Sequence, residues 1–236
     1  DLDASPSSFV LESKKIEIPG YPHAFNPSII RWKGSLLLTF RHIPNPKSSF
    51  VSYIGIARLD EEFTIIGIPQ ILETQDRHSS IPSRADDSRL IAVGDSLFLV
   101  FSDNKEAKIS KKGFRVYLAR LTEKGNKFNV HDVECLSHFE GESPLIREKN
   151  WTPFSHEGNL LLSYSITPHR ILRPLLHTNS CETLCQTATP FPWQWGEPRG
   201  GTTALLEGDE YLAFFHSSCV NKKPKLSNFQ VVSQFN

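Results

Sequence analysis

Short apolar runs separated by polar turns follow one another along most of the chain. In residues 53–59 and 115–121, apolar and polar side chains largely alternate, which is typical of strands that bury one face. Segments with the period of a helix and with capping residues are scarce, and only residues 182–188 indicate a short helix. The pattern therefore predicts an all-β protein.

One pattern occurs four times, in segments that align without gaps: residues 26–40, 86–100, 150–164 and 200–214. Each segment has a glycine at one position and a hydroxyl-bearing residue six positions earlier. The glycines are Gly34, Gly94, Gly158 and Gly208, and the hydroxyl-bearing residues are Ser28, Ser88, Thr152 and Thr202. An apolar strand, a polar turn at the glycine and a second apolar strand are typical of a β-hairpin. We therefore predict hairpins near residues 26–41, 86–102, 150–165 and 200–216.

The spacing of the repeats indicates a β-propeller. Successive glycines lie about 50 to 64 residues apart, which suits four-stranded sheets joined by loops of varied length. The runs at 53–59 and 115–121 would then be outer strands. A β-sandwich also has short strands, but it gives no reason for one motif to recur four times. We expect a single propeller domain over residues 1–236, with its inner strands beginning at a central channel.

Composition and charge exclude several classes of partner. The chain has 236 residues, with 26 Lys plus Arg and 26 Asp plus Glu, so its formal net charge is zero. A neutral chain has no global electrostatic attraction to nucleic acid or to an anionic membrane, and any anion site must be local. The longest central apolar run, Leu97 to Phe101, is far too short to span a bilayer. No signal peptide is visible in the first residues, so a cytoplasmic location is expected.

The cysteines give little indication of a metal or redox site. Cys181 and Cys185 have a wider spacing than the usual CxxC motif, and His177 lies nearby. An ordinary loop is the favoured interpretation, with a metal or redox role as the alternative. We expect neither a metal nor an organic cofactor.

The starts of the four inner strands would converge on the channel, and only the second supplies carboxylates. Asp86 and Asp87 are adjacent and are bracketed by Arg84 and Arg89. Such a pair is expected to have separated pKa values, with one carboxylate ionised against a guanidinium and the other able to hold a proton. The pair could therefore supply a general acid. The alternative is a solvated turn in which aspartate and serine cap the backbone.

Basic, polar and aromatic side chains occur at matching places in the other repeats. The basic ones are Arg41 and His42 after the first hairpin, Lys149 before the third, and Arg199 before and His216 after the fourth. Together they would suit an anion, although each alone could simply extend into water. Asn26, Asn150 and Thr202 occupy further channel positions. Trp151 could stack on a sugar ring or belong to the core, and the sequence leaves both open.

Several of these motifs resemble those of the β-mannoside phosphorylases, which form family 130 of the glycoside hydrolases. The matching segments are Phe25-Asn26-Pro27-Ser28 with Leu38-Thr39-Phe40-Arg41, Asp86-Asp87-Ser88-Arg89-Leu90, and Gly201-Thr202-Thr203 with Phe215-His216. The resemblance implies a five-bladed propeller that cleaves or forms β-mannosidic or related bonds in oligosaccharides. Inorganic phosphate would be the co-substrate.

The resemblance also implies roles for individual residues. It places the catalytic acid at Asp87, arginines of the site at Arg41 and Arg89, and a phosphate-binding histidine at His216; Lys149 is a looser match to a phosphate-binding lysine. The chain departs from the pattern at Ser88, where the family usually has proline, and at Asp86, where it has glutamate. A fifth glycine turn at the same spacing would lie beyond Asn236, so the last blade is expected to be incomplete in this chain.

The distribution of carboxylates favours phosphorolysis over hydrolysis. An inverting hydrolase needs an acid and a second carboxylate to activate water, whereas phosphate arrives as an anion and needs cations and one acid. The other repeats have Asn26, Asn150 and Gly200 at the position of Asp86. Glu142 and Glu148 precede the third hairpin closely enough that a base among them stays open. The alternatives are a hydrolase or glycosyl-transferring enzyme on this scaffold, or a degenerate propeller that binds glycans or a protein partner.

Overall fold

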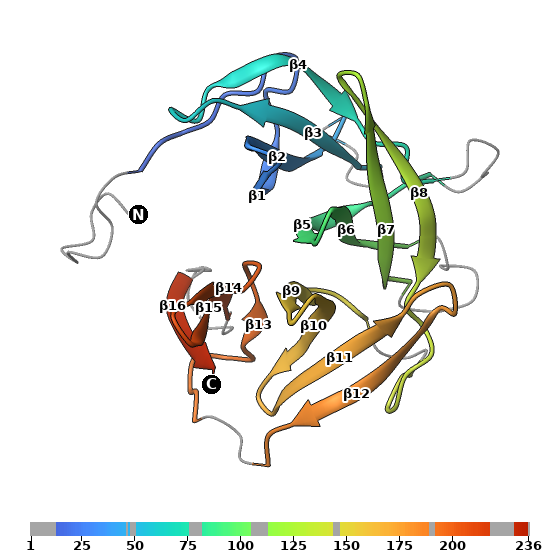
Figure 1. Ribbon diagram of the computed structural model, residues 1–236, viewed down its shortest axis with the longest axis vertical. Coiled ribbons are helices and arrows are strands. Elements are labelled where there is room, and N and C mark those ends of the chain that lie inside the picture. The colour runs from blue at the N-terminus through green and yellow to red at the C-terminus, as the bar shows by residue number, and fades with distance from the viewer. Residues whose placement is uncertain are drawn as a thin grey trace.

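The computed structural model describes residues 13–45, 47, 51–75, 82–104, 113–143, 147–188 and 192–217, and the backbone of 229–235. These residues form four antiparallel sheets arranged around a centre, as Figure 1 shows. None of the described segments forms a helix of the length and apolarity that crossing a membrane requires. The all-β class and the propeller arrangement are confirmed.

The first three blades have the same order of four strands from the centre outward. The first contains β1 (Phe25–Trp32), β2 (Ser35–His42), β3 (Tyr53–Leu59) and β4 (Ile65–Ile71). The second contains β5 (Asp86–Val93), β6 (Ser96–Asp103), β7 (Arg115–Lys124) and β8 (Lys127–Cys135). The third contains β9 (Thr152–His156), β10 (Asn159–Ile166), β11 (His169–Leu175) and β12 (Ser180–Gln186). The predicted hairpins are β1–β2, β5–β6 and β9–β10, and β3 and β7 are the predicted outer strands.

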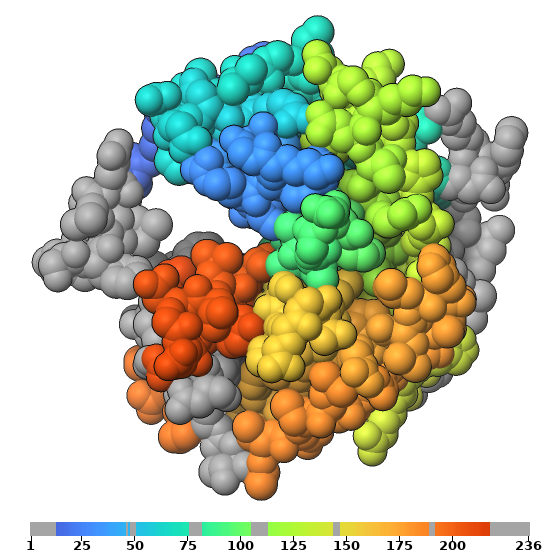
Figure 2. Space-filling view, viewed as in Figure 1, coloured from blue at the N-terminus to red at the C-terminus, as the bar shows by residue number. Residues whose placement is uncertain are grey.

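The fourth blade has an interrupted inner strand. β13 (Arg199–Gly200) and β14 (Leu205–Glu207) both pair with β15 (Glu210–His216), and β16 (Phe229–Phe235) pairs along β15 as well. The described residues thus form four blades, and the fifth blade implied by the resemblance is not among them. Figures 1 and 2 show an open sector between the first blade, in blue, and the fourth, in red and orange.

The short helix predicted at residues 182–188 is wrong, because β12 extends through Gln186 and pairs with β11. Cross-strand pairing outweighs the weak helical pattern of this segment. Cys181 is buried and Cys185 is exposed on the same strand. Strand residues four apart are separated by about 13 Å, too far to share one metal ion, so the metal alternative for these cysteines is not supported.

The glycines at the four hairpin turns are not equivalent in three dimensions. In the first and third hairpins the glycine is the second turn residue, and both turn residues have positive φ: Lys33 and Gly34 at 48° and 75°, Glu157 and Gly158 at 48° and 75°. In the second and fourth, the glycine comes first: Gly94 at 56° and Gly208 at 62°. These patterns correspond to type I′ and type II′ turns. Alignment on glycine therefore shifts the second and fourth repeats by one residue relative to the first and third.

The corrected alignment changes which carboxylate matches the other inner strands. Asp87, rather than Asp86, is equivalent to Asn26 and Asn150. All three have left-handed φ values, of 51°, 51° and 63°, in a region that asparagine and aspartate tolerate better than other side chains. One polar residue in this conformation therefore lies close to the start of the inner strand in each of the first three blades.

Apolar side chains fill the spaces between neighbouring blades. One cluster, which includes Leu37, Ile54 and Leu99, lies between the first and second blades; another lies between the second and third. The repeated hydroxyls also join blades, since Ser88 Oγ donates to Thr39 Oγ1 at 3.0 Å and Leu90 N donates to Ser28 Oγ at 3.2 Å. The cluster between the third and fourth blades is smaller and contains alanines.

We expect Gly55→Ala to lower the free energy of unfolding by about 1–3 kcal/mol, because a Cβ at Gly55 would lie 2.1 Å from the buried ring of Phe40. Chemical denaturation measures this loss. The double variant Gly55→Ala, Phe40→Leu should be more stable than the sum of the two single changes predicts. Strict additivity would show that the two residues are not in contact.

Candidate active site

The four blades surround one polar cavity with a volume of ≈ 850 Å³. Eight residues predicted for the site line it: Asn26, Asp87, Arg89, Lys149, Asn150, Trp151, Thr202 and His216. Asp86 and Arg41 are not lining residues; they form an ion pair with each other at 3.2 Å. The repeats therefore bring distant segments of the chain to one cavity.

Asp87 is the member of the carboxylate pair that faces the cavity. Its side chain is 16% exposed, and its Oδ2 lies 3.0 Å from Lys149 Nζ. Its Oδ1 accepts a hydrogen bond of 2.9 Å from the Asn26 amide. Asp87 is thus held by the first blade on one side and by the segment before the third blade on the other.

Asp86 is almost completely buried, with 3% of its side chain exposed. Its Oδ2 lies 2.8 Å from Lys149 Nζ and 3.2 Å from Arg41 Nη1. Arg41 and Lys149 were expected to bind phosphate, but here both bind carboxylates. An anion in the cavity would have to compete with the aspartates for Lys149.

The two aspartates have separate pKa values, as predicted, but Asp86 rather than Asp87 is the one that holds a proton more readily. Burial raises the pKa of Asp86 to about 6, and the neighbouring charge of Asp87 adds to the rise. Burial acts in the same direction on Asp87, but the Lys149 ammonium and then the Arg89 guanidinium outweigh it and hold the pKa of Asp87 below its ordinary value. With only protein groups around it, Asp87 is ionised.

Arg89 links the second blade to the fourth, and His216 belongs to the fourth blade. Arg89 Nε donates to Gly201 O at 2.6 Å, and Arg89 Nη1 donates to Ser88 O at 2.8 Å. Burial and then the charge of Arg199 lower the pKa of His216. His216 is therefore neutral at pH 7, and it supplies a hydrogen-bonding group rather than the positive charge that the sequence suggested.

Trp151 belongs to the core, which was one of its two predicted roles. The residue is 3% exposed, and its ring packs edge-on against Phe139 and Tyr164. Its indole N–H donates to Glu148 Oε2 at 3.1 Å. Thr202, in contrast, is exposed, and its Oγ1 accepts a hydrogen bond from Phe214 N at 2.9 Å.

Glu148 is a second carboxylate in the cavity wall, and the repeat alignment did not assign it to the site. It is 3% exposed and lines the cavity together with Asp87. Of the two glutamates that the sequence left open as a base, Glu142 is not a lining residue and instead pairs with Arg115 at 3.3 Å. The only sequence signal for Glu148 is its position beside Lys149, just before the third inner strand.

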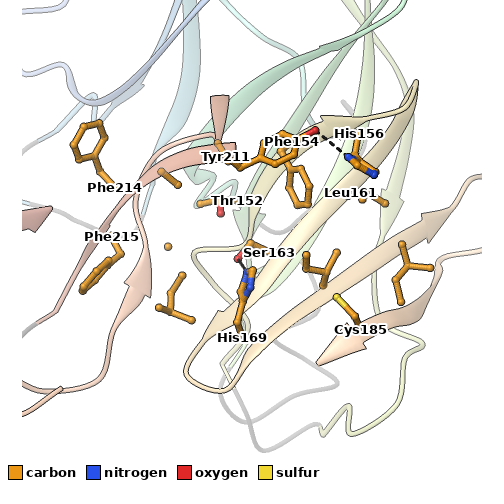
Figure 3. Close-up of a pocket in the computed structure, with 16 residues that line it drawn as sticks. Thr152, Phe154, His156, Leu161, Ser163, His169, Cys185, Tyr211, Phe214 and Phe215 are labelled. Atoms are coloured by element: carbon orange, nitrogen blue, oxygen red, sulfur yellow. Dashed lines mark hydrogen bonds between the residues drawn. The ribbon is translucent and has the colours of Figure 1, made fainter. Parts of the chain in front are cut away.

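A smaller cavity of ≈ 270 Å³ lies between the third and fourth blades, as Figure 3 shows. Its walls are mainly apolar, with Phe154, Leu161 and Phe215 among them. Two pairs of its polar side chains lie within hydrogen-bonding distance: His169 Nε2 lies 3.1 Å from Ser163 Oγ, and His156 Nδ1 lies 3.1 Å from Tyr211 Oη. None of the described residues that line it carries a carboxylate, the usual acid of glycosidic chemistry. The larger polar cavity is therefore the candidate active site.

Among the described residues, no group of three or more His, Cys, Asp or Glu side chains is arranged to hold a metal ion. The described residues that line the polar cavity offer carboxylates, basic groups and hydroxyls. These groups can transfer protons, bind an anion and hydrogen-bond to sugar hydroxyls.

The chain matches no protein-family model and no curated protein sequence. Its structure is similar to several solved propellers. A glycosyl hydrolase from Bacteroides ovatus has a TM-score of 0.56 and 11% sequence identity, over 82% of this chain and 60% of that chain. The GH43_1 enzyme from Xanthomonas citri, solved with xylotriose, has a TM-score of 0.54 and 15% identity, over 82% and 63%.

A β-1,2-mannobiose phosphorylase from Listeria innocua, in complex with β-1,2-mannobiose, has a TM-score of 0.50 and 15% identity, over 83% of this chain and 68% of that chain. The chain thus spans about three fifths of the length of the Bacteroides and Xanthomonas proteins. At these identities, the comparisons establish that the chain has the propeller fold of known glycosidases and phosphorylases.

Proposed function

We propose that this protein is a carbohydrate-active enzyme that cleaves or forms a β-mannosidic or related bond of an oligosaccharide in the polar cavity. The observation that carries the proposal is the position of Asp87, which starts the inner strand of the second blade, faces the cavity and is surrounded by hydrogen-bonding groups. A carboxyl group at this position can donate a proton to the oxygen of the leaving sugar. Asn150, Thr202 and Tyr164 offer polar contacts for sugar hydroxyls.

Phosphate is the acceptor that we propose for the sugar. Among the described residues, four basic side chains line the cavity, Arg89, Arg147, Lys149 and Arg199, against three carboxylates, Asp87, Glu148 and Glu197. The excess of positive charge favours the binding of an anion. Phosphate is already an anion, so no base is needed to activate it as the acceptor. The neutral His216 would add a hydrogen bond to a phosphate oxygen.

Bound phosphate would also favour the protonated form of Asp87. In the free protein, Lys149 and Arg89 keep Asp87 ionised. A bound phosphate would neutralise these cations and add negative charge nearby, and both changes raise the pKa of a carboxyl group. Asp86, with a pKa of about 6, is an adjacent source of the proton. Asp87 would therefore be able to donate a proton once phosphate is bound.

Hydrolysis is the second candidate, and one observation favours it. Glu148 lines the same cavity as Asp87, and an acid with a second carboxylate is the arrangement that inverting hydrolases use.

Asp87→Asn should lower the turnover of a β-linked mannobiose about 10²–10⁴-fold, because an amide cannot donate the proton that a poor leaving group needs. An aryl mannoside, whose leaving group needs little protonation, should be affected much less. Asp95→Asn, in the exposed turn of the same blade, is the matched control and should keep full activity. Retention of mannobiose turnover within tenfold would remove Asp87 from this role.

The pH dependence should differ between kcat/KM and kcat. The acid must hold its proton, so the rate falls as pH rises through the pKa of Asp87. This pKa is lowered in the free protein, which kcat/KM reports, and bound phosphate should raise it in the complex, which kcat reports. The alkaline limb of kcat should therefore lie at higher pH. Coincident limbs would contradict the coupling between phosphate and Asp87.

Phosphate should raise the melting temperature of the protein relative to chloride at equal ionic strength. Ligand linkage gives about 2.7 kcal/mol at a hundredfold excess over the dissociation constant, and the gain should shrink at high salt. Because His216 lines the cavity and Arg41 does not, His216→Ala should weaken the effect more than Arg41→Ala. The absence of any phosphate-specific shift would count against phosphorolysis.

A further inference from the structure

The interface between the third and fourth blades lacks a large apolar side chain that the other two interfaces have. The hairpin registers align Leu99 of the second blade, Leu162 of the third and Ala213 of the fourth, because each lies three residues after the first paired residue that follows its turn. Leu99 and Leu162 are completely buried against the preceding blade. Ala213 faces the preceding blade in the same way, but it contributes only a methyl group.

The missing side chain coincides with the apolar cavity of ≈ 270 Å³, because Ala213 lines that cavity. Ala204, also from the fourth blade, is a second small residue in its wall. A core position with too few side-chain atoms leaves a cavity where the surroundings do not collapse onto it. An engineered apolar cavity of about 150 Å³ binds benzene. The space between these two blades is therefore large enough for a molecule with two rings.

Aromatic rings from both blades line this cavity (Figure 3). Phe154 of the third blade and Tyr211 of the fourth lie edge to face, with their ring centroids 5.2 Å apart. Phe215 of the fourth blade lines another part of the wall. Aromatic pairs in such arrangements gain energy beyond that of the area they bury. The walls therefore favour an aromatic guest over an aliphatic one of the same size.

The walls provide no partner for a charged ligand. The described residues that line the cavity include no Lys, Arg, Asp or Glu. Burial lowers the pKa of His169, so this imidazole is neutral at pH 7, and it lies 3.1 Å from Ser163 Oγ. None of the described lining side chains has a buried polar atom without a partner. A charged molecule would lose its hydration here without compensation, whereas a neutral apolar one would not.

The cavity is accessible from the outer edge of the third blade. Leu184 and Cys185, on the outermost strand β12, line it and are exposed. Toward the centre, Gly200 packs so closely on the third blade that a Cβ there would lie 2.4 Å from Asn150 O. Gly200 lines both cavities, so its backbone forms part of the wall between them.

We propose that this apolar cavity is a second binding site, which takes a small, neutral aromatic molecule. The bound ring occupies the space that leucine fills in the other interfaces, and it joins the fourth blade to the third. The fourth blade contributes Thr202 and His216 to the polar cavity, so occupancy of the apolar cavity also stabilises one wall of the polar cavity. The proposal does not depend on the chemistry of the polar cavity.

An NMR titration of the protein with indole, a neutral molecule of two rings, tests the site. Indole should bind the wild type with a dissociation constant of about 1 mM or lower. Indole-3-carboxylate has the same rings and a charge that the cavity does not pair, so it should bind at least about tenfold more weakly. Cyclooctanol, an aliphatic molecule of similar size, should bind about two- to tenfold more weakly than indole.

Ala213→Leu supplies the missing side chain. It should weaken indole binding at least about tenfold and raise the melting temperature of the ligand-free protein, because it fills part of the cavity with apolar atoms. Leu212→Ala is the matched control, since this residue lies on the same strand and is outside the cavity lining. It should leave indole binding unchanged.

The thiol of Cys185 reports occupancy of the cavity in the wild type, so this test does not depend on the folding of a variant. Saturating indole should slow the alkylation of Cys185 by iodoacetamide at least about threefold. The alkylation of Cys135, which is outside the cavity lining, should keep its rate. Mass spectrometry of the peptides measures both rates.

The possible failures are distinguishable. The absence of saturable indole binding in the wild type would overturn the site altogether. Unchanged indole affinity in Ala213→Leu, or unslowed alkylation of Cys185, would overturn its location. Equal binding of indole-3-carboxylate would overturn the requirement for a neutral ligand, and equal binding of cyclooctanol the requirement for an aromatic one. None of these results depends on the activity of the polar cavity, which Asp87→Asn tests separately.

Discussion

The central cavity depends on the buried pair Asp86 and Asp87, which is bound from the first blade and from the segment that precedes the third. Arg41 reaches Asp86 from the first blade, and Lys149, which precedes the third, bridges both carboxylates. Arg89, two residues after the pair, donates to a backbone carbonyl of the fourth blade. These contacts place one carboxylate in the cavity and hold its neighbour behind it.

This network is a weak source of stability for the fold. Removing charges from water costs several kcal/mol per ion, and mutual attraction offsets that cost only where geometry and hydrogen bonding are good. The raised pKa of Asp86 and its buried Oδ1, which has no hydrogen-bond partner among the described residues, show that the cost is only partly offset here. The apolar clusters between the blades supply the stabilisation, while the carboxylates supply chemistry. The proposed protonation of Asp87 uses Asp86, this incompletely neutralised neighbour, as its source of the proton.

Most of the architecture could be predicted from the chain because hairpins are local. The turns at Gly34, Gly94, Gly158 and Gly208 lie within short segments whose apolar pattern is visible without a partner, and each forms a hairpin. The prediction at residues 182–188 was wrong because pairing with β11 stabilises a strand there. That pairing cannot be inferred from the residues of the segment alone. The register of the second repeat was displaced for a related reason, since glycine occupies either position of a two-residue turn.

The sequence by itself determined the all-β class, the four hairpins and the set of polar residues that start the inner strands, because each follows from neighbours along the chain. Only the tertiary structure decided that Asp87 rather than Asp86 faces the cavity, that Lys149 binds aspartates and that Glu148 completes the wall. In each case the partner is contributed by another blade or by a segment between blades. The pKa of a carboxylate and its access to a substrate are set by groups within a few ångströms in space, and those groups come together only when the blades pack.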